Sequence, residues 1–220
     1  MPNIIKFREL VSTQDTAMEL VAMGRAKNKT VIVADMQHGG RGRYKRKWES
    51  PAGNLYCSFI CNSPERNPTL SYTVAVAAAE TLISFGITPK IKWPNDILVS
   101  GKKICGILIE YSKNFVVIGI GINVVSNPKL DAYETTRVNE YAPDVSRDEV
   151  LAELITQMDI WMKRDFATVR ARWTELAASI NETVRYRGTD AVLCGINEDG
   201  ALVMRAGSKY IIAMGDEIFI

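Results

Sequence analysis

The chain has one histidine, His38, in 220 residues, and this scarcity removes whole classes of catalytic chemistry. A metal centre with several imidazole ligands and a catalytic triad built on histidine both have almost no material here. The four cysteines, Cys57, Cys61, Cys105 and Cys194, lie inside apolar runs without a C-x-x-C spacing. That pattern predicts buried, reduced thiols and argues against a zinc site or a redox pair.

Excess charge of one sign and long apolar runs are also scarce. The formal net charge is only +2, so the molecule as a whole has no strong field to attract nucleic acid or an anionic membrane. No apolar run approaches the length that spans a bilayer, and residues 1–10 carry charges where a signal peptide would have its apolar core. We therefore expect a soluble, cytoplasmic protein without a membrane partner.

Apolar material is plentiful, since 47% of the residues are hydrophobic, and this is enough for a large core. Strands are expected at residues 4–10, 30–34, 55–60, 91–93, 97–99, 104–111 and 115–125. Helices are expected from Ser12 or Thr13 to about Gly24, and at 70–85, 146–163 and 166–178. The short turns between the last four strands predict an antiparallel meander.

The C-terminal part of the chain has a different pattern. Residues 179–220 alternate short apolar runs with a turn at 197–200, which predicts a small β-barrel. We expect a single domain boundary, which separates a larger domain of residues 1–178 from a C-terminal domain of residues 179–220.

The segment from Gly39 to Trp48 is the first of three that carry residues suited to chemistry. It shows no periodicity, which predicts a loop, and it combines glycines with several arginines and lysines. Glycines let a backbone approach a ligand closely, and guanidinium groups match phosphate oxygens. The spacing is not that of a Walker A loop. An exposed basic loop without a partner and a contact to nucleic acid are the other interpretations of this composition.

The second segment, Lys92 to Asp96, places the amide of Asn95 and the carboxylate of Asp96 just past a strand end. Side chains there can reach a ligand without breaking a sheet, although a simple turn would use the same residues. Lys103 follows seven residues after Asp96, at the start of a strongly apolar strand. A lysine in that position is expected to be paired.

The third segment contains Gly119 and Gly121, which fall on one face of a predicted strand. Missing side chains on a sheet face suggest a flat ligand lying against it, while a bulge or close helix packing would require the same glycines. Together the three segments supply anion-binding cations, a carboxylate that could hold magnesium, and a cleared sheet face. ATP and an organic acid would suit such a site.

With these motifs in this order, the chain resembles the biotin protein ligase family over nearly its whole length. The resemblance rests on four runs, Gly40–Trp48, Lys92–Asp96, Lys103–Glu110 and Gly119–Asn123. It implies an α+β catalytic domain with a mixed, largely antiparallel sheet flanked by helices, like that of class II aminoacyl-tRNA synthetases, followed by an SH3-like β-barrel. It also implies an enzyme that uses ATP and Mg²⁺ to convert biotin to biotinyl-5′-AMP.

The resemblance further implies that the biotinyl group passes to a lysine of a biotin carboxyl carrier protein, and that the enzyme forms a homodimer. The helix-turn-helix domain that some members carry is expected to be absent, because Ser12 already belongs to the first motif. A ligase that does not bind DNA follows from that expectation.

The resemblance assigns roles to individual positions. Ser12, Thr13 and Gln37 would hydrogen-bond the ureido group of biotin, and Trp48 would cover its apolar side. Lys103 would hold the biotin carboxylate and the α-phosphate. The remaining expected site residues are Arg43 over the adenylate, Asn95 at the adenine, Asp96 at magnesium or the incoming lysine, and Gly40, Arg41, Gly106, Gly119, Gly121 and Asn123.

Two positions depart from the family pattern. Gln14 stands where asparagine is usual, so no biotin contact is assigned to it. Lys45 stands where the loop usually has glycine, and we expect it to contact phosphate from a backbone conformation that does not require glycine.

Two alternatives stay open. A lipoate ligase would share the fold and the adenylate chemistry, but the complete arginine-rich loop and the Lys92–Asp96 run favour biotin. A nucleic-acid-binding module would use residues 41–47. The low net charge, with only Tyr44 and Trp48 as aromatic residues near that loop, argues against it.

Overall fold

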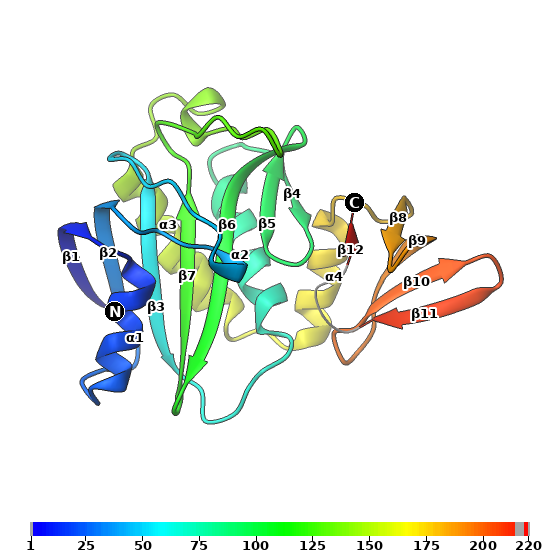
Figure 1. The fold of residues 1–220 in the computed structure, drawn as a ribbon, viewed down its shortest axis with the longest axis horizontal. Helices are drawn as coiled ribbons and strands as arrows, with labels where there is room; N and C mark the ends of the chain where they lie inside the picture. The colour runs from blue at the N-terminus through cyan, green and yellow to red at the C-terminus, as the bar shows by residue number, and fades with distance from the viewer. Residues whose placement is uncertain (1, 214–217, 220) are drawn as a thin grey trace.

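Two β-sheets and four α-helices make up the computed structural model, which describes residues 2–213, 218 and 219 (Figure 1). The larger sheet has seven strands in the order β1-β2-β3-β7-β6-β5-β4, and the smaller has five in the order β11-β10-β9-β8-β12. None of the helices in the described part of the chain combines the length and apolar character needed to cross a bilayer.

The larger sheet confirms the predicted mixed, largely antiparallel arrangement. Only β1 and β2 pair in parallel, and β4 to β7 form the predicted meander. Its strands are β1 (Asn3–Leu10), β2 (Thr30–Gln37), β3 (Leu55–Asn62), β4 (Pro89–Lys92), β5 (Asp96–Val99), β6 (Lys102–Ser112) and β7 (Phe115–Ile122). The helices are α1 (Thr13–Ala22), α2 (Leu70–Ile83), α3 (Arg147–Trp161) and α4 (Phe166–Leu176), with 3₁₀ turns η1 (Arg43–Lys45) and η2 (Val138–Glu140).

Helices cover both faces of this sheet, which explains why its strands are apolar on both sides. On β2, Val31 and Val33 join the large core under α2 and α3, whereas Ile32 joins a smaller core under α1. The α1 helix packs on β2, β3 and β7, and η1 lies on the same side of the sheet (Figure 1). The α1 face is therefore only partly covered by helix.

Helix α1 begins where the sequence predicts. The side chain of its N-cap, Ser12, accepts the backbone N–H of Asp15 at 3.3 Å. Since α1 connects two parallel strands, Ser12 at the end of β1 and Gln37 at the end of β2 lie at the same edge of the sheet. The carboxyl ends of parallel strands are a common place for ligands in α/β proteins.

Strand β7 is shorter than predicted and ends at Ile122 instead of residue 125. Its neighbour β3 starts at Leu55, so β3 has no residues to pair with those after Ile122. The side chain of Asn54 takes that place, because its Oδ1 accepts the N–H groups of Val124, Val125 and Ser126 at 2.8, 3.0 and 3.1 Å. Conversely, β2 runs three residues beyond its predicted end and reaches Gln37.

The smaller sheet follows α4 and packs beside α2 and α4. Its strands are β8 (Thr183–Tyr186), β9 (Thr189–Ile196), β10 (Leu202–Ala206), β11 (Lys209–Ala213) and β12 (Ile218–Phe219). All its pairings are antiparallel, and β11 and β12 are its edge strands. Residues 214–217 and 220 of the predicted C-terminal domain lie outside the described residues, so closure into a barrel stays a prediction.

One side chain connects the two sheets through α2. The hydroxyl of Tyr72 donates to the carbonyl of Gly200 at 2.6 Å, and Trp93 Nε1 lies 3.3 Å from the same hydroxyl. The ring of the buried Trp173, on α4, meets the Tyr72 ring edge-on at 5.3 Å between centroids. This contact fixes the small sheet next to the segment Lys92–Asp96.

Candidate active site

A cleft of about 650 Å³ opens on the α1 face of the larger sheet. Its walls are the start of α1, the segment that contains η1, and residues 132–134, and its floor is formed by β3, β6 and β7. It collects every predicted site residue except two. Those lining it are Ser12, Thr13, Gln37, Arg41, Arg43, Trp48, Asn95, Asp96, Lys103, Gly106, Gly119 and Gly121.

Polar side chains from two strand ends form one end of the cleft. Gln37 Oε1 accepts the backbone N–H of Thr13 at 2.8 Å, and Gln37 Nε2 donates to Ser50 Oγ at 2.8 Å. Ser12 and Thr13 are 2% and 4% exposed. The sequence therefore predicted a real cluster, held in place by β1, α1 and β2.

Two residues of this end were missed from the sequence. Ser58 on β3 is fully buried and lies 3.0 Å from Thr13 Oγ1 and 3.1 Å from Gln14 Oε1. Gln14 also donates from Nε2 to Glu110 at 2.9 Å and to the Val117 carbonyl at 3.2 Å. A polar residue at Ser58, in the middle of an apolar strand, was the signal that could have been used.

The glycine floor is occupied by protein side chains. Gly106 and Gly121 are paired across β6 and β7, and a Cβ on either would lie 2.8 or 2.6 Å from the indole of Trp48. A Cβ on Gly119 would lie 2.6 Å from Gln14 Oε1. The interpretation that the glycines clear space directly for a flat ligand is thus corrected, because they make room for Trp48 and Gln14, which face the cleft in turn.

The opposite end of the cleft holds an ion pair between Lys103 and Asp96. Their Nζ and Oδ1 atoms are 2.7 Å apart, with side-chain exposures of 14% and 25%. The ammonium also lies 5.2 Å from the ring of Trp48 and 5.4 Å from the ring of Tyr133, within the range of cation–π attraction. The expectation that Lys103 is paired is confirmed, and Tyr133 is a cleft residue that the sequence did not indicate.

Arg41 contacts carboxylates of the protein. Its guanidinium donates from Nη1 and Nη2 to the two oxygens of Glu110 at 2.9 and 2.8 Å, and from Nε to Asp15 at 2.8 Å. The hydrogen bonds to Glu110 are the main cause that raises the pKa of Arg41. Burial would raise the pKa of Glu110, but the hydrogen bonds from Arg41 and Gln14 keep it below its ordinary value. Arg41 therefore connects the basic segment, Gly39 to Trp48, to α1 and β6.

The basic segment is an ordered, hairpin-like turn. An isolated bridge joins Arg41 to Lys47, and the N–H of Gly42 donates to Arg46 O at 2.8 Å. Lys45 has a φ of 58°, next to Tyr44 with a φ of 55°. The expectation that Lys45 avoids the conformation typical of glycine is therefore wrong, because the tight turn between the bridged residues requires a left-handed backbone there.

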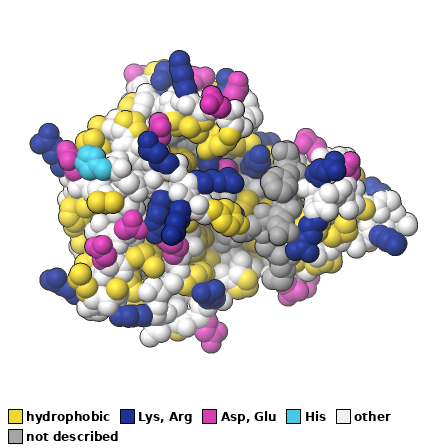
Figure 2. All heavy atoms as spheres, viewed as in Figure 1, with side chains coloured by type: hydrophobic (Ala, Val, Ile, Leu, Met, Phe, Trp, Pro, Cys, Tyr) yellow, Lys and Arg dark blue, Asp and Glu magenta, His cyan; other side chains and the backbone are white. Residues whose placement is uncertain are grey.

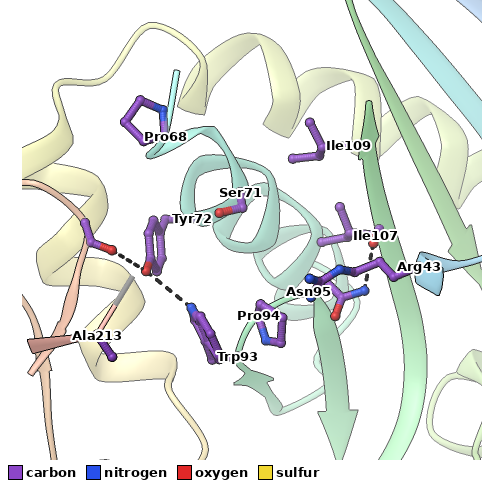
Figure 3. A pocket seen from close by; sticks show the side chains of 11 residues that line it. Arg43, Pro68, Ser71, Tyr72, Trp93, Pro94, Asn95, Ile107, Ile109 and Ala213 are labelled. Atoms are coloured by element: carbon purple, nitrogen blue, oxygen red, sulfur yellow. Dashed lines mark hydrogen bonds between the residues drawn. The ribbon is translucent and has the colours of Figure 1, made fainter. Parts of the chain in front are cut away.

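A second, smaller cavity of about 310 Å³ adjoins the ion-pair end and reaches the small sheet. Figure 3 shows Arg43 and Asn95 side by side at one end of it and Tyr72, Trp93 and Ala213 at the other. Asn95 is fixed by a bond from its Nδ2 to the Ile107 carbonyl at 2.9 Å. Burial lowers the pKa of Arg43.

Two predicted residues lie elsewhere. Asn123 is buried outside the cleft lining, where its Nδ2 donates to the Thr136 carbonyl at 2.9 Å, so its amide holds the segment after β7. Gly40 faces the protein interior, because a Cβ there would lie 2.5 Å from Ser50 Oγ and 2.6 Å from the Trp48 carbonyl. A glycine is therefore needed at position 40 so that the two segments can pack closely.

The surface around the cleft is basic in places. Lys and Arg side chains gather near the middle of the face in Figure 2, over the region where Figure 1 places η1. Within the described residues, no three His, Cys, Asp or Glu side chains are grouped as a metal site. The cysteines in that part of the chain are free, with Cys57 and Cys105 buried and Cys61 and Cys194 half-buried.

The chain is similar to known proteins in both sequence and structure. A model of the biotin/lipoate A/B protein ligase family matches residues 7–125. The bifunctional ligase/repressor BirA of Bacillus subtilis is 33% identical over 95% of this chain and 72% of its own length. The biotin–[acetyl-CoA-carboxylase] ligase of Paracoccus denitrificans is 31% identical over 86% of this chain and 89% of its own.

A solved structure is similar over both sheets. The biotin protein ligase of Aquifex aeolicus in complex with biotin and ATP superposes with a TM-score of 0.89 at 29% identity, covering 100% of this chain and 98% of the other. The similarity thus includes the small sheet as well as the residues that form the cleft.

Proposed function

Because the chain belongs to the biotin/lipoate A/B protein ligase family, we propose that it activates biotin with ATP as biotinyl-5′-AMP and transfers the biotinyl group to a lysine of a biotin carboxyl carrier protein. One observation carries the proposal. A single cleft has neutral hydrogen-bonding groups at the α1 end and the Lys103–Asp96 pair at the β6 end. Biotin has the matching form, with a neutral ureido group at one end and a carboxylate at the other.

In the first step, a carboxylate oxygen of biotin attacks the α-phosphorus of ATP. A new O–P bond forms while the bond to the bridging oxygen breaks, and pyrophosphate leaves. Negative charge gathers on the α-phosphate oxygens, where a preorganised cation stabilises it most. Lys103, held by Asp96 and close to the ring of Trp48, would take that role, and Arg43, which lines the same cleft, would contact the adenylate.

In the second step, the neutral amine of the acceptor lysine attacks the acyl carbon. An amide bond forms, the mixed anhydride bond to the phosphate breaks, AMP leaves with the electron pair, and the attacking nitrogen releases one proton to the solvent. We infer that the acyl carbon of the adenylate is presented near Asp96 and Lys103. We assign to Asp96 the positioning of the incoming amine.

Magnesium would enter with the nucleotide. Mg²⁺ is commonly bound by one or two carboxylates together with substrate phosphates. Asp96 in the cleft can supply one such carboxylate. The described residues include no group of side chains that could hold the ion without the nucleotide. When bound, the ion would neutralise charge on the phosphates.

The small cavity beside the cleft is proposed as the adenine site. Asn95 offers an amide there, and Gly200 and Ala213 complete the wall from the small sheet. We also propose that residues 179–220 form an SH3-like barrel domain behind a catalytic domain of class II synthetase type. The family resemblance supports this, and it also supports a homodimer.

The test is ATP-dependent incorporation of labelled biotin into a carboxylase carrier domain. Wild-type protein should transfer biotin, and a Lys103→Ala variant should not. Replacing biotin by lipoate separates the two branches of the family, since transfer of lipoate alone would refute the biotin assignment. A gel-shift assay with duplex DNA tests the remaining alternative, in which residues 41–47 bind nucleic acid.

A further inference from the structure

The hydroxyl of Thr13 belongs to a chain of hydrogen bonds whose direction is fixed by the contacts of Gln14. The chain starts at Gln14, whose Nε2 lies 2.9 Å from Glu110 Oε2 and 3.2 Å from the Val117 carbonyl. A carbonyl oxygen accepts only, and so does an ionised carboxylate. The NH₂ group of Gln14 must therefore point toward them, and its oxygen must point the other way.

The next two links follow from proton counting. Gln14 Oε1 is an acceptor, so the single proton of Ser58 Oγ, 3.1 Å away, is donated to it. Ser58 Oγ also lies 3.0 Å from Thr13 Oγ1. Because the Ser58 proton is already used, that second contact needs the proton of Thr13. Thr13 therefore has only lone pairs left for a ligand in the cleft.

The neighbours of Thr13 offer hydrogen-bond donors to a ligand. Ser12 Oγ accepts the N–H of Asp15, which leaves its own proton for donation. Gln37 Oε1 accepts the N–H of Thr13, so its amide nitrogen points the other way, where one N–H bonds Ser50 Oγ and one is left to donate. This end of the cleft thus places one hydrogen-bond acceptor among donors. A urea has the complementary order, an N–H beside a carbonyl oxygen.

We propose that Ser58 and Gln14 are positioning residues that fix the Thr13 hydroxyl as an acceptor and thereby make the site selective for an N–H at that position of the ligand. The inference rests on the proposed function, which places the ureido group here. Both residues are almost completely buried and act through Thr13. Position 14 departs from the family pattern. The side chain of Gln14 lies against Gly119 and is long enough to reach Glu110 with its amide nitrogen.

The experiment measures the Kd values of biotin and of its two cyclic carbamates, in each of which one ureido N–H is replaced by oxygen, by calorimetry. In wild-type protein, one carbamate should bind about 10- to 100-fold more weakly than biotin, because a ring oxygen would face the lone pairs of Thr13. In Ser58→Ala, Thr13 can turn its proton toward that oxygen. The penalty for this carbamate relative to biotin should then shrink by about 10-fold.

Two further variants keep the test decisive. Gln14→Met removes the acceptor that orients Ser58 and should give the same loss of discrimination. Thr81→Val deletes an equally buried hydroxyl of α2, which bonds the Ala77 carbonyl at 2.9 Å, and should keep the wild-type ratio. Unchanged discrimination in both cleft variants would overturn this inference alone. If wild-type protein did not bind biotin at all, the proposed function and this inference would both be refuted.

Discussion

Lys103 Nζ lies 2.7 Å from Asp96 Oδ1 at the end of the cleft, between the rings of Trp48 and Tyr133. Register explains the meeting, because β5 and β6 are antiparallel neighbours and a bulge in this pairing falls between Ile97 and Leu98. The carboxylate thus holds the ammonium at this end of the cleft.

Replacing Lys103 by alanine should nearly abolish adenylate formation. The charge expected at the reacting phosphate would be lost, and removal of a preorganised donor of this kind typically costs about 3 to 4 kcal/mol, or about 10²- to 10³-fold in rate. Pyrophosphate release measures the effect. Lys102→Ala is the matched control, because that neighbouring lysine is paired with Glu134 at 3.6 Å and should keep most activity. A wild-type rate in Lys103→Ala would remove this lysine from the mechanism.

An Asp96→Asn variant should fold but need more magnesium. An amide oxygen is a weaker magnesium ligand than a carboxylate, so the midpoint of the magnesium titration should rise by about 10-fold or more. Mg²⁺-dependent binding of ATP, measured without turnover, gives a second readout. Asp96→Glu retains the charge and should recover part of the affinity. An unaltered titration in Asp96→Asn would show that this carboxylate does not contact the ion.

A glycine at position 45 should slow the release of biotinyl-adenylate. Lys45 is exposed and has a φ of 58°, a conformation that costs a non-glycine residue roughly 1 kcal/mol or more. Relief of about 1 kcal/mol would raise the population of the ordered turn and slow release by about 5-fold. Lys45→Ala keeps the Cβ and removes the ammonium, so it should release at the wild-type rate. Faster release from both variants, fading at high salt, would show that a phosphate contact outweighs the strain.

The Glu110 carboxylate should make stability depend on pH in acid. Its pKa in the folded protein is lowered despite burial, because Arg41 and Gln14 donate hydrogen bonds to it. Its contribution is therefore complete above the unfolded-state pKa of about 4.3 and is lost as pH falls through the lower folded-state pKa. Urea unfolding at pH 7 and pH 3.5 should show a smaller pH effect in Glu110→Gln than in wild type. The exposed Glu65→Gln is the control, and an equal pH effect in all three proteins would contradict the argument.

Much of the fold could be predicted because local chemistry decides it. The cap at Ser12 and the capping box of Ser146 with Glu149 start α1 and α3 as expected, and short turns determine the meander. Strand β7 was predicted too long because residues 123–125 are apolar enough for a strand. The backbone N–H groups of Val124 and Val125 are bonded instead to the side chain of Asn54, about 70 positions away, which periodicity cannot reveal.

The sequence indicated which residues line the cleft better than it indicated the contacts that these residues make. Motifs indicate which residues gather, but only the folded structure shows that Arg41 bonds Asp15 and Glu110, or that Trp48 lies on Gly106 and Gly121. These partners come from strands and helices far apart in sequence, so their choice depends on packing. Asn123 shows the converse, since a polar residue inside a motif can serve the backbone alone.

The bond from Tyr72 to Gly200 also bears on how the protein is made. It joins residues 128 positions apart, and both Gly200 and Ala213 line the cavity assigned to adenine. During translation, domains fold as the chain emerges, at about 5 to 20 residues per second. A nascent chain that ends before residue 200 has the strands of the larger sheet but lacks one wall of this cavity. If the cavity takes adenine as proposed, nucleotide binding can assist folding only after this wall has been synthesised.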